Sequence, residues 1–375
     1  MARKAIAKNI AYDEQRKTYY VTMDYGKDEK GKRLKKVETF KELKEAKQAL
    51  KIFEGDKTKG VVVKPVKETV KDFCEYWLEF EKSGTRQTTK WGYVNILKNH
   101  VYVYFKNKEL QKVSKQDIHR YMVWLTDKGL SSNTVCKHYT LLKDMFSSAE
   151  RAGKIFVSPL KTIKPPKKEK PKTSIYTVEQ VKVLLEKVKG DRIELPVRLA
   201  VSMGLRRGEI CGLRFKNVNL KEKYIDIVES RVEIGDSIVE GGVKSDFSER
   251  QIEIPDSLIP VLERIKAEQK QNKKDFEDDY YKDDFVFCWA DGRPYRPNFL
   301  SDLFSDFLKK HELPHIRFHD LRHTFGSIAV LNAPLREVSK AMGHSREDFT
   351  DKVYIKDLQK TKRVAVNAVD NILNV

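Results

Sequence analysis

A proline- and lysine-rich segment divides this chain into two parts. Residues 161–172 hold three prolines and six lysines against a single acidic residue, Glu169, and they show no helical periodicity. Proline fixes its own backbone and disfavours helix in the residue before it, so we expect an extended linker over residues 159–172. A chain of 375 residues is long enough for two or three domains. We therefore expect separate domains on the two sides of this linker.

The net charge of the chain indicates a polyanionic partner. The 74 lysines and arginines outnumber the 55 acidic residues, which gives a formal charge of +19. Each phosphate that a basic protein neutralises releases a condensed counterion, which favours nucleic acid. A membrane surface also attracts basic proteins, but no apolar run approaches the roughly 20 residues of a spanning helix, and no apolar signal region follows the basic start. Nucleic acid is therefore the favoured partner.

The cysteines and histidines give no reason to expect a metal, a cofactor or a disulfide. None of the cysteines forms a C-x-x-C pair, and the eight histidines contain no H-E-x-x-H motif. Cysteines spaced this widely are typical of small buried side chains in a reducing compartment, which predicts a cytoplasmic protein. The four are Cys74, Cys136, Cys211 and Cys288.

Residues 1–62 predict a small α+β module. Three stretches rich in Tyr, Val and Thr predict a three-stranded sheet. They are residues 9–12, 18–24 and 34–39. Thr39 followed by Glu42 is a capping-box pattern, which predicts a helix that runs to about Phe53.

Residues 66–158 predict a helical bundle with a basic polar face. The expected helices cover residues 69–82, 88–104, 115–126 and 133–152. Phe73, Trp77, Leu78 and Phe80 recur at helical spacing, so we expect them in the core of the bundle.

Residues 173–375 predict a mainly helical domain with a small β-sheet. Thr177 and Gln180 form a capping box before a helix. A β-rich stretch follows, and helices return from residue 257. The expected strands are residues 224–228, 238–243 and 250–254, and residues 335–342 and 358–373 are two of the expected helices.

Short motifs in this last segment carry residues suited to phosphodiester chemistry. They are Gly204-Leu-Arg-Arg-Gly-Glu209, His319-Asp-Leu-Arg-His323, Met342-Gly-His344 and Lys352-Val-Tyr354. When a protein nucleophile attacks a phosphodiester, negative charge accumulates on the phosphate oxygens, and arginine can donate to two of these oxygens at once. Gly204 is expected to end one helix, which leaves Arg206 near the start of the next, although the adjacent Arg207 suits the same role.

Together these motifs resemble the active site of the tyrosine recombinases, the phage and transposon integrase family. The resemblance implies that Tyr354 is the nucleophile and that Arg206, rather than Arg207, clamps the phosphate together with Arg322. It also implies that His319 acts as a base or positions the tyrosine, and that His344 is catalytic. Glu209 and His323 are implied to support this site rather than to react.

A lysine is the remaining catalytic residue that the resemblance implies. Lys244 lies in what looks like a β-hairpin, where the family carries a lysine that protonates the departing 5′-oxygen. The family pattern Thr-Lys-Thr-x-x-Ser-x-Arg is only partly kept, because Lys244, Ser248 and Arg250 match while Asp246 and Phe247 are atypical.

The resemblance also implies a multidomain α+β fold. It comprises an arm-type DNA-binding domain over residues 1–62, a core-binding helical domain over 66–158 and a catalytic domain over 173–375. The implied activity is site-specific recombination of double-stranded DNA at core-type and arm-type sites, as the integrase of a phage or transposon. The implied assembly is a homotetramer on DNA, joined by an accessory DNA-bending or directionality protein. The helix over 358–373 would dock on its own domain or on a neighbouring protomer.

Three other functions compete with this interpretation. A type IB topoisomerase uses the same chemistry, but it gains little from a separate N-terminal domain. A DNA-binding regulator without catalysis would not need every catalytic position to be filled. An RNA-binding protein would need exposed aromatic side chains on which bases can stack, and no motif of that kind is recognisable.

Overall fold

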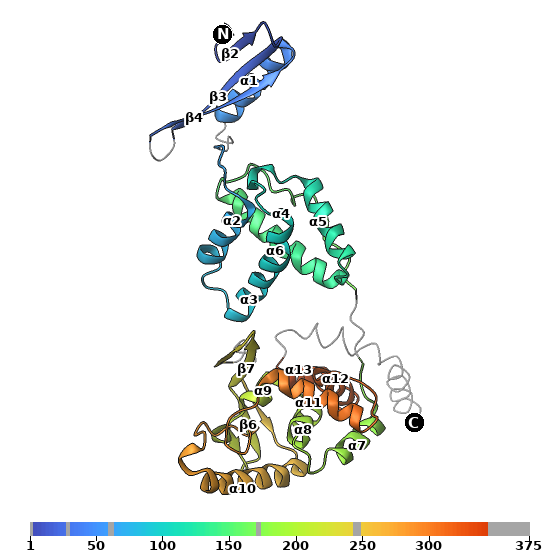
Figure 1. Ribbon diagram of the computed structural model, residues 1–375. Helices are drawn as coiled ribbons and strands as arrows, with labels where there is room; N and C mark the ends of the chain where they lie inside the picture. Colours follow the sequence, from blue (N-terminus) through green and yellow to red (C-terminus); the bar gives the residue numbers. More distant parts are fainter. Residues whose placement is uncertain (1–2, 28–30, 59–63, 170–173, 243–248, 344–375) are drawn as a thin grey trace, which may run out of the picture. The chain divides into compact units, whose positions relative to one another are not determined.

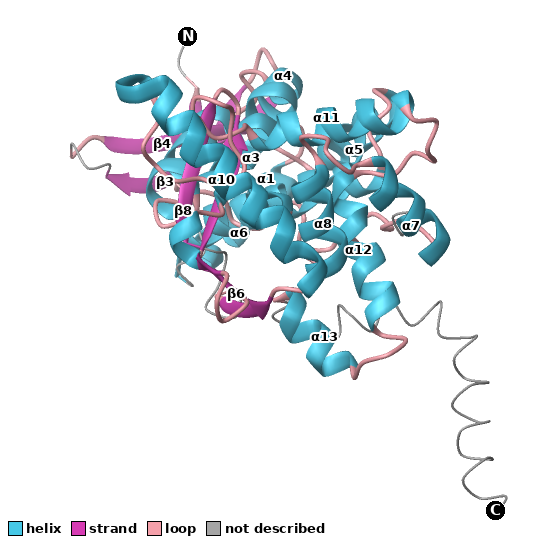
Figure 2. Ribbon diagram, turned by 90° about the horizontal axis from the view of Figure 1, so that it is seen from below, coloured by secondary structure: helices cyan, strands magenta, loops and turns pink. Residues whose placement is uncertain are grey.

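The chain forms two compact units in a computed structural model (Figure 1). The units are Met1–Lys170 and Pro171–Val375, so the boundary between them falls inside the proline- and lysine-rich segment. The structure describes residues 3–27, 31–58, 64–169, 174–242 and 249–343. Helices make up most of the described chain (Figure 2). None of the described helices is long and apolar enough to cross a membrane.

The first unit begins with an antiparallel sheet in the order β1-β2-β3-β4. Its strands are β1 (Lys4–Ala7), β2 (Ile10–Asp13), β3 (Thr18–Lys27) and β4 (Arg33–Phe40). The three predicted strands are confirmed as β2, β3 and β4, but the expected three-stranded sheet was wrong by one strand. All four residues of β1 are exposed, so this strand has no alternation of buried and exposed residues to reveal it. It joins β2 through Asn9, whose φ of 65° suits a tight turn.

Helix α1 (Leu43–Thr58) covers this sheet with Ala46 and Phe53, which are buried against Val21. The helix begins three residues later than a capping box at Thr39 predicts. Thr39 is instead paired with Tyr20 in the sheet, because β4 continues to Phe40. Strand pairing therefore overrides the capping pattern here.

The helical bundle follows the predicted boundaries to within one or two residues. Its helices are α2 (Val70–Tyr76), α3 (Gln87–Ile96), α4 (Tyr102–Phe105), α5 (Lys115–Asp127) and α6 (Ser132–Arg151). A π-helical turn, Trp77–Glu81, extends α2, and a second, Leu97–Val101, joins α3 to α4. Thr69 and Ser114 close capping boxes at the starts of α2 and α5.

The core of the bundle contains most of the residues expected there. Phe73 and Trp77 are fully buried, and Leu78 packs against the same cluster. Phe80 was expected in the core, but 59% of the residue is exposed. The π-helical turn shifts the positions after Trp77 relative to an ideal α-helix, and Phe80 instead contacts the ring of Tyr76 at the surface.

The start of the proline- and lysine-rich segment packs along α6. Leu160 and Ile163 are buried in the bundle core. Tyr139 donates a hydrogen bond of 2.6 Å from its hydroxyl to the carbonyl of Ile163, and the Cys136 thiol donates to the carbonyl of Pro166 at 3.0 Å. Residues 159–162 form turns, and residues 163–169 form neither helix nor strand. The apolar residues of the segment pack on the bundle, which an extended linker between domains did not predict.

The second unit surrounds its core with helices and two small sheets. Its helices are α7 (Val178–Lys187), α8 (Glu194–Met203), α9 (Arg207–Gly212), α10 (Ile259–Phe276), α11 (Pro297–Lys310), α12 (Phe318–Ala329) and α13 (Leu335–Met342). One sheet has the order β5-β6-β9, and the other is a β7-β8 hairpin. The strands are β5 (Val218–Asn219), β6 (Tyr224–Ile227), β7 (Glu229–Ile234), β8 (Ser237–Gly242) and β9 (Arg250–Glu253).

The predicted strands of this unit correspond to β6, β8 and β9, whereas β5 and β7 were not predicted. Strand β7 faces β8 across a two-residue turn, Gly235-Asp236, and Gly235 has a positive φ of 57°. Helix α12 packs against both α8 and α11 in the core. This packing brings the motifs at residues 204–209 and 319–323 together.

Candidate active site

Arg206 lies at the junction between α8 and α9. Helix α8 ends at Gly204, which has a left-handed φ of 67°, and Arg206 is the N-cap of α9, as predicted. A side chain at position 204 would also meet Phe325 of α12, since a Cβ atom there would lie 2.5 Å from the ring atom Cδ1. Glycine is therefore required at this junction both for its backbone angle and for the close approach of α12.

Glu209 holds Arg206 in one orientation. The backbone N–H of Arg206 donates to Oε2 of Glu209 at 2.8 Å, and Nη1 of the guanidinium donates to Oε1 at 2.6 Å. The other guanidinium nitrogen, Nη2, donates to the carbonyl of Gly343 at 2.7 Å. The side chain of Arg206 remains 33% exposed, so part of it is accessible to a ligand.

Arg207, the alternative to Arg206 in the sequence, points elsewhere. Its Nη1 donates to the Ser301 hydroxyl on α11 at 2.7 Å. The geometry of the junction therefore favours Arg206 for a role beside Glu209.

Arg322 joins the ends of two other helices. It projects from α12, and only 2% of it is exposed. Its Nη1 donates to the carbonyl of Gly204 at the end of α8, and its Nη2 donates to the carbonyl of Met342 at the end of α13. Arg206 and Arg322 thus bind adjacent carbonyls, those of Gly343 and Met342, although they come from different helices.

The two histidines of the second motif lie one turn apart on α12. The rings of His319 and His323 are perpendicular, with centroids 5.0 Å apart. His319 is at the surface, but the neighbouring groups displace part of its hydration. This desolvation, together with repulsion from His323 when that ring is protonated and from Arg322 and Arg206, lowers the pKa of His319 to about 4. Desolvation also lowers the pKa of His323. Both imidazoles are therefore neutral at pH 7, the state in which a histidine can accept a proton.

Arg250 contributes to this site in a way that the motif analysis missed. It extends from β9 and donates from Nη1 and Nη2 to the two carboxylate oxygens of Glu209, at 3.2 and 3.0 Å. Its Nε donates to the carbonyl of Ala341 at 2.8 Å. In the sequence, Arg250 was noticeable only because it matches the Ser-x-Arg part of the family pattern. Its pairing with Glu209 became apparent only from the fold.

The carboxylate of Glu209 is buried and ionised. Burial raises its pKa, but the positive charge and hydrogen bonds of Arg250, followed by those of Arg206, outweigh this effect and lower the pKa to about 2. Only 1% of the Glu209 side chain is exposed. Glu209 therefore acts as a fixed negative charge between two arginines.

Three of the predicted catalytic residues, Lys244, His344 and Tyr354, lie outside the described residues. Strand β8 ends at Gly242, two residues before Lys244. Helix α13 ends at Gly343, as predicted, with a left-handed φ of 61°, directly before His344. Within the described ranges, no three His, Cys, Asp or Glu side chains gather as metal ligands would.

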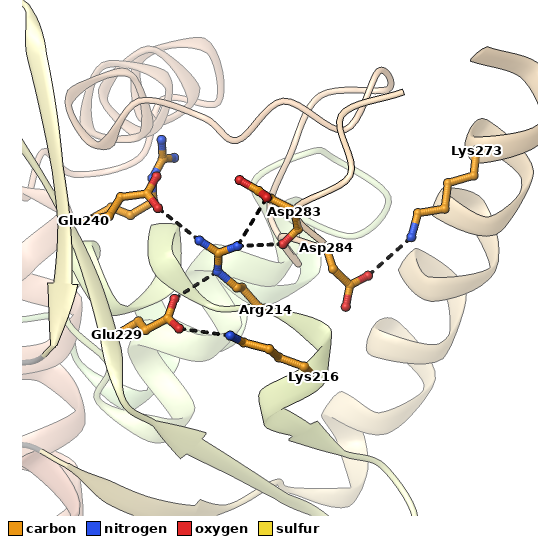
Figure 3. Close-up of polar contacts among 8 residues, drawn as sticks. Arg214, Lys216, Glu229, Glu240, Lys273, Asp283 and Asp284 are labelled. Atoms are coloured by element: carbon orange, nitrogen blue, oxygen red, sulfur yellow. Dashed lines mark hydrogen bonds and ion pairs between the residues drawn. The ribbon is translucent and has the colours of Figure 1, made fainter. Parts of the chain in front are cut away.

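The base of the β7-β8 hairpin is anchored by a network of ion pairs (Figure 3). Arg214 donates to Glu229 of β7 at 2.9 Å and to Glu240 of β8 at 3.0 Å, and its Nη1 donates to the carbonyl of Asp283. Lys216 forms a second ion pair with Glu229. The network therefore ties both strands of the hairpin to the body of the unit.

Glycines in α9 let the same hairpin approach closely. A Cβ atom at Gly208 would lie 2.5 Å from the hydroxyl oxygen of Ser230, and one at Gly212 would lie 3.2 Å from the backbone nitrogen of Arg231. Helix α9, which Arg206 caps, therefore packs directly on β7. Gly208 belongs to the motif at residues 204–209, but the motif alone did not show that this glycine is needed for the contact with β7.

Two family models match the chain. The phage integrase family matches residues 175–361, and the N-terminal SAM-like domain of phage integrases matches residues 69–124. The first match contains every predicted catalytic residue, and the second lies within the helical bundle.

Similar proteins extend along nearly the whole chain. A XerC-like tyrosine recombinase from Caldanaerobacter subterraneus is 28% identical over 98% of this chain and 100% of its own length. An integrase from Streptomyces ambofaciens is 25% identical over 97% of this chain and 95% of its own length.

Solved structures share the fold. The Tn1549 transposon integrase, in complex with a circular intermediate DNA, superposes with a TM-score of 0.66 at 18% identity and covers 79% of this chain and 99% of its own. A lambda integrase tetramer bound to a Holliday junction gives a TM-score of 0.60 at 16% identity, with 94% of this chain and 96% of its own covered. This likeness is one of fold. The two family models, which match residues 175–361 and 69–124, show that the chain belongs to the phage integrase family of tyrosine recombinases.

Proposed function

We propose that this protein is the integrase of a phage or transposon, which cleaves and rejoins double-stranded DNA through Tyr354. The Tyr354 hydroxyl oxygen attacks the scissile phosphorus and loses its proton to a nearby base, His319 or His344. The bond from phosphorus to the 5′-oxygen breaks, and Lys244 supplies the proton that makes the departing group a 5′-hydroxyl. A 3′-phosphotyrosine remains, and a 5′-hydroxyl from the same or another duplex reverses the step. Because the covalent link preserves the phosphoester bond energy, no cofactor is needed.

One observation carries this proposal furthest. Arg206 and Arg322 come from motifs far apart in the chain, yet they bind adjacent carbonyls at the end of α13, the residues just before His344. Two guanidinium groups at one place supply the positive donors that a phosphorane with extra negative charge requires. We propose that a DNA phosphate binds at this position and engages the exposed part of Arg206.

The other parts of the chain take roles that match this chemistry. We propose that residues 66–158 bind the core-type site beside residues 173–375, with residues 159–172 as the connection. Residues 1–62 would bind arm-type DNA through the sheet. The lambda integrase forms a tetramer on a Holliday junction in its solved structure, which supports a homotetramer on DNA for this chain also. An accessory DNA-bending or directionality protein would act with it, in the cytoplasm of a bacterium.

Covalent trapping in cells tests the proposed nucleophile. Cells that express the wild type, Tyr354→Phe or Tyr281→Phe are lysed in detergent, and DNA attached to the protein is precipitated and sequenced. Tyr281 is 42% exposed, so its substitution serves as a matched control. We expect adducts at discrete DNA positions with the wild type and with Tyr281→Phe, and none with Tyr354→Phe.

The other outcomes of this experiment are equally informative. Equal adducts with Tyr354→Phe would assign the nucleophile to another residue. DNA that is bound but never covalently attached in any of the three proteins would favour a regulator without catalysis. Adducts scattered without positional preference would favour a relaxing enzyme of the topoisomerase kind.

A further inference from the structure

The end of α13 is held by three arginines from three different elements. Arg250 of β9 binds the carbonyl of Ala341, Arg322 of α12 binds that of Met342, and Arg206 at the start of α9 binds that of Gly343. The last carbonyls of a helix have no partner within the helix and form the negative end of its dipole. Cations at this position stabilise the helix end, so each arginine also fixes where α13 stops.

Arg250 and Arg206 also share a second partner, the carboxylate of Glu209. Only 8% of the Arg250 side chain is exposed. Arg206 retains an exposed part that a ligand can reach, whereas the Arg250 side chain is almost entirely buried.

Charge balance gives Arg250 a function for the reaction. Three arginines and one glutamate leave a net charge of +2 at this junction. Without Arg250, the full charge of Glu209 would act on Arg206 and weaken its attraction for a phosphate. Arg250 therefore keeps Arg206 positive toward a ligand while Glu209 holds Arg206 in place.

Arg250 also packs against the residue where α13 ends. A Cβ atom at Gly343 would lie 3.0 Å from Nη1 of Arg250, so the guanidinium is in contact with that glycine. The planar fork that binds Glu209 through two nitrogens and Ala341 through a third cannot be reproduced by lysine, which has a single ammonium group.

We infer that Arg250 is a positioning residue of the recombination reaction, which acts through Arg206 and the end of α13 without touching DNA. This inference rests on the proposed function. It predicts that loss of Arg250 lowers the rate of strand cleavage far more than it lowers affinity for DNA.

Single-turnover cleavage of the trapped DNA site tests the inference. The proteins compared are the full-length wild type, Arg250→Lys, Arg250→Gln, Glu209→Gln and the double variant Arg250→Gln/Glu209→Gln. Formation of the covalent complex, the dissociation constant for the DNA and the thermal unfolding temperature are measured for each.

Arg198→Gln is the matched control. Arg198 is also a largely buried arginine of this unit, and its Nε pairs with Glu194 at 3.0 Å on α8, within one turn of the same helix. Its loss should lower the unfolding temperature as Arg250→Gln does, without an effect on the end of α13.

We expect Arg250→Gln and Arg250→Lys to cleave roughly 100-fold more slowly with DNA affinity changed by less than about threefold, since small misplacements of reacting groups cost about this much. The double variant should cleave faster than Arg250→Gln, because removal of the Glu209 charge restores the positive charge of Arg206. The inference would be overturned if the cleavage rate of the double variant fell by the product of the factors seen in Arg250→Gln and Glu209→Gln. It would also be overturned if Arg198→Gln lost as much cleavage rate as Arg250→Gln. If the wild type itself forms no covalent complex, the proposed function fails instead.

Discussion

A buried guanidinium must find acceptors for its N–H groups, and at this site the acceptors are backbone carbonyls. Arg322 is almost fully buried and bridges Gly204 and Met342. Its truncation to alanine would leave two carbonyls without a donor, at a cost of about 1–3 kcal/mol for each buried group. At the scale of a residue, the arginines proposed to bind phosphate therefore also hold helix ends together. The cleavage rate of an arginine variant has to be compared with its free energy of unfolding before a loss of rate is assigned to catalysis.

The ionisation of His319 is the prediction that belongs to this scale. Because its pKa is lowered to about 4 from an ordinary 6.5, the unfolded chain binds a proton between these pH values that the folded chain does not. The contribution of His319 to stability is therefore complete above pH 6.5 and is lost as the pH falls toward 4. We expect an NMR titration of the histidine ring protons to place His319 well below 6.5.

His319→Gln identifies the resonance in that titration and removes the corresponding pH dependence of unfolding. Addition of a duplex that contains the target phosphate should raise the midpoint, because a nearby anion favours the imidazolium. A midpoint at or above 6.5 in the DNA-free protein would contradict the surroundings described for this ring.

At the scale of an element, helix ends decide where the site forms. Helix α8 stops at Gly204 and α13 stops at Gly343, both in left-handed conformations. Each stop leaves a carbonyl within reach of Arg322 or Arg206. The two glycines therefore determine where the acceptor carbonyls lie, and the two arginines supply the N–H groups that donate to them.

Substitution of Gly204 tests this role. Gly204→Ala introduces a left-handed alanine, which costs about 1–2 kcal/mol, and also a contact with Phe325 that forces α12 away, at about 1–3 kcal/mol more. Gly190→Ala is the matched control, since Gly190 has a φ of 73° but nothing within 4 Å of its would-be Cβ.

Hydrogen exchange of the full-length protein separates the two substitutions. We expect faster exchange in peptides of α8 and α12 for Gly204→Ala, and a much smaller change for Gly190→Ala. Equal effects would mean that backbone strain alone, and not the approach of α12, explains the glycine at position 204.

At the scale of the whole molecule, charge governs association with DNA. A formal charge of +19 predicts that binding depends steeply on salt. For about 6–10 phosphate contacts, affinity should fall by roughly 10³–10⁵ between about 50 and 200 mM salt. Fluorescence anisotropy with a labelled duplex and the Tyr354→Phe protein measures this without cleavage. An affinity that stays constant over this range would contradict a DNA-binding role for the basic surface.

The sequence by itself determined the features that depend on neighbours in the chain. Helices of the bundle were predicted to within one or two residues, because the hydrophobic periodicity that indicates a helix depends on residues only a few positions apart. The stops at Gly204 and Gly343 were predicted for the same reason. Resemblance of the short motifs was enough to predict the family.

Only the tertiary structure decided the features that depend on distant segments. Strand β1 forms because β2 is there to pair with it, and Thr39 joins a sheet rather than a helix because β3 lies beside it. The contact of Arg207 with Ser301 and the pairing of Arg250 with Glu209 follow from how α9, α11 and β9 pack. Hydrogen bonds of this kind form between atoms brought together by the burial of apolar surface, and no local pattern in the chain encodes which atoms will meet.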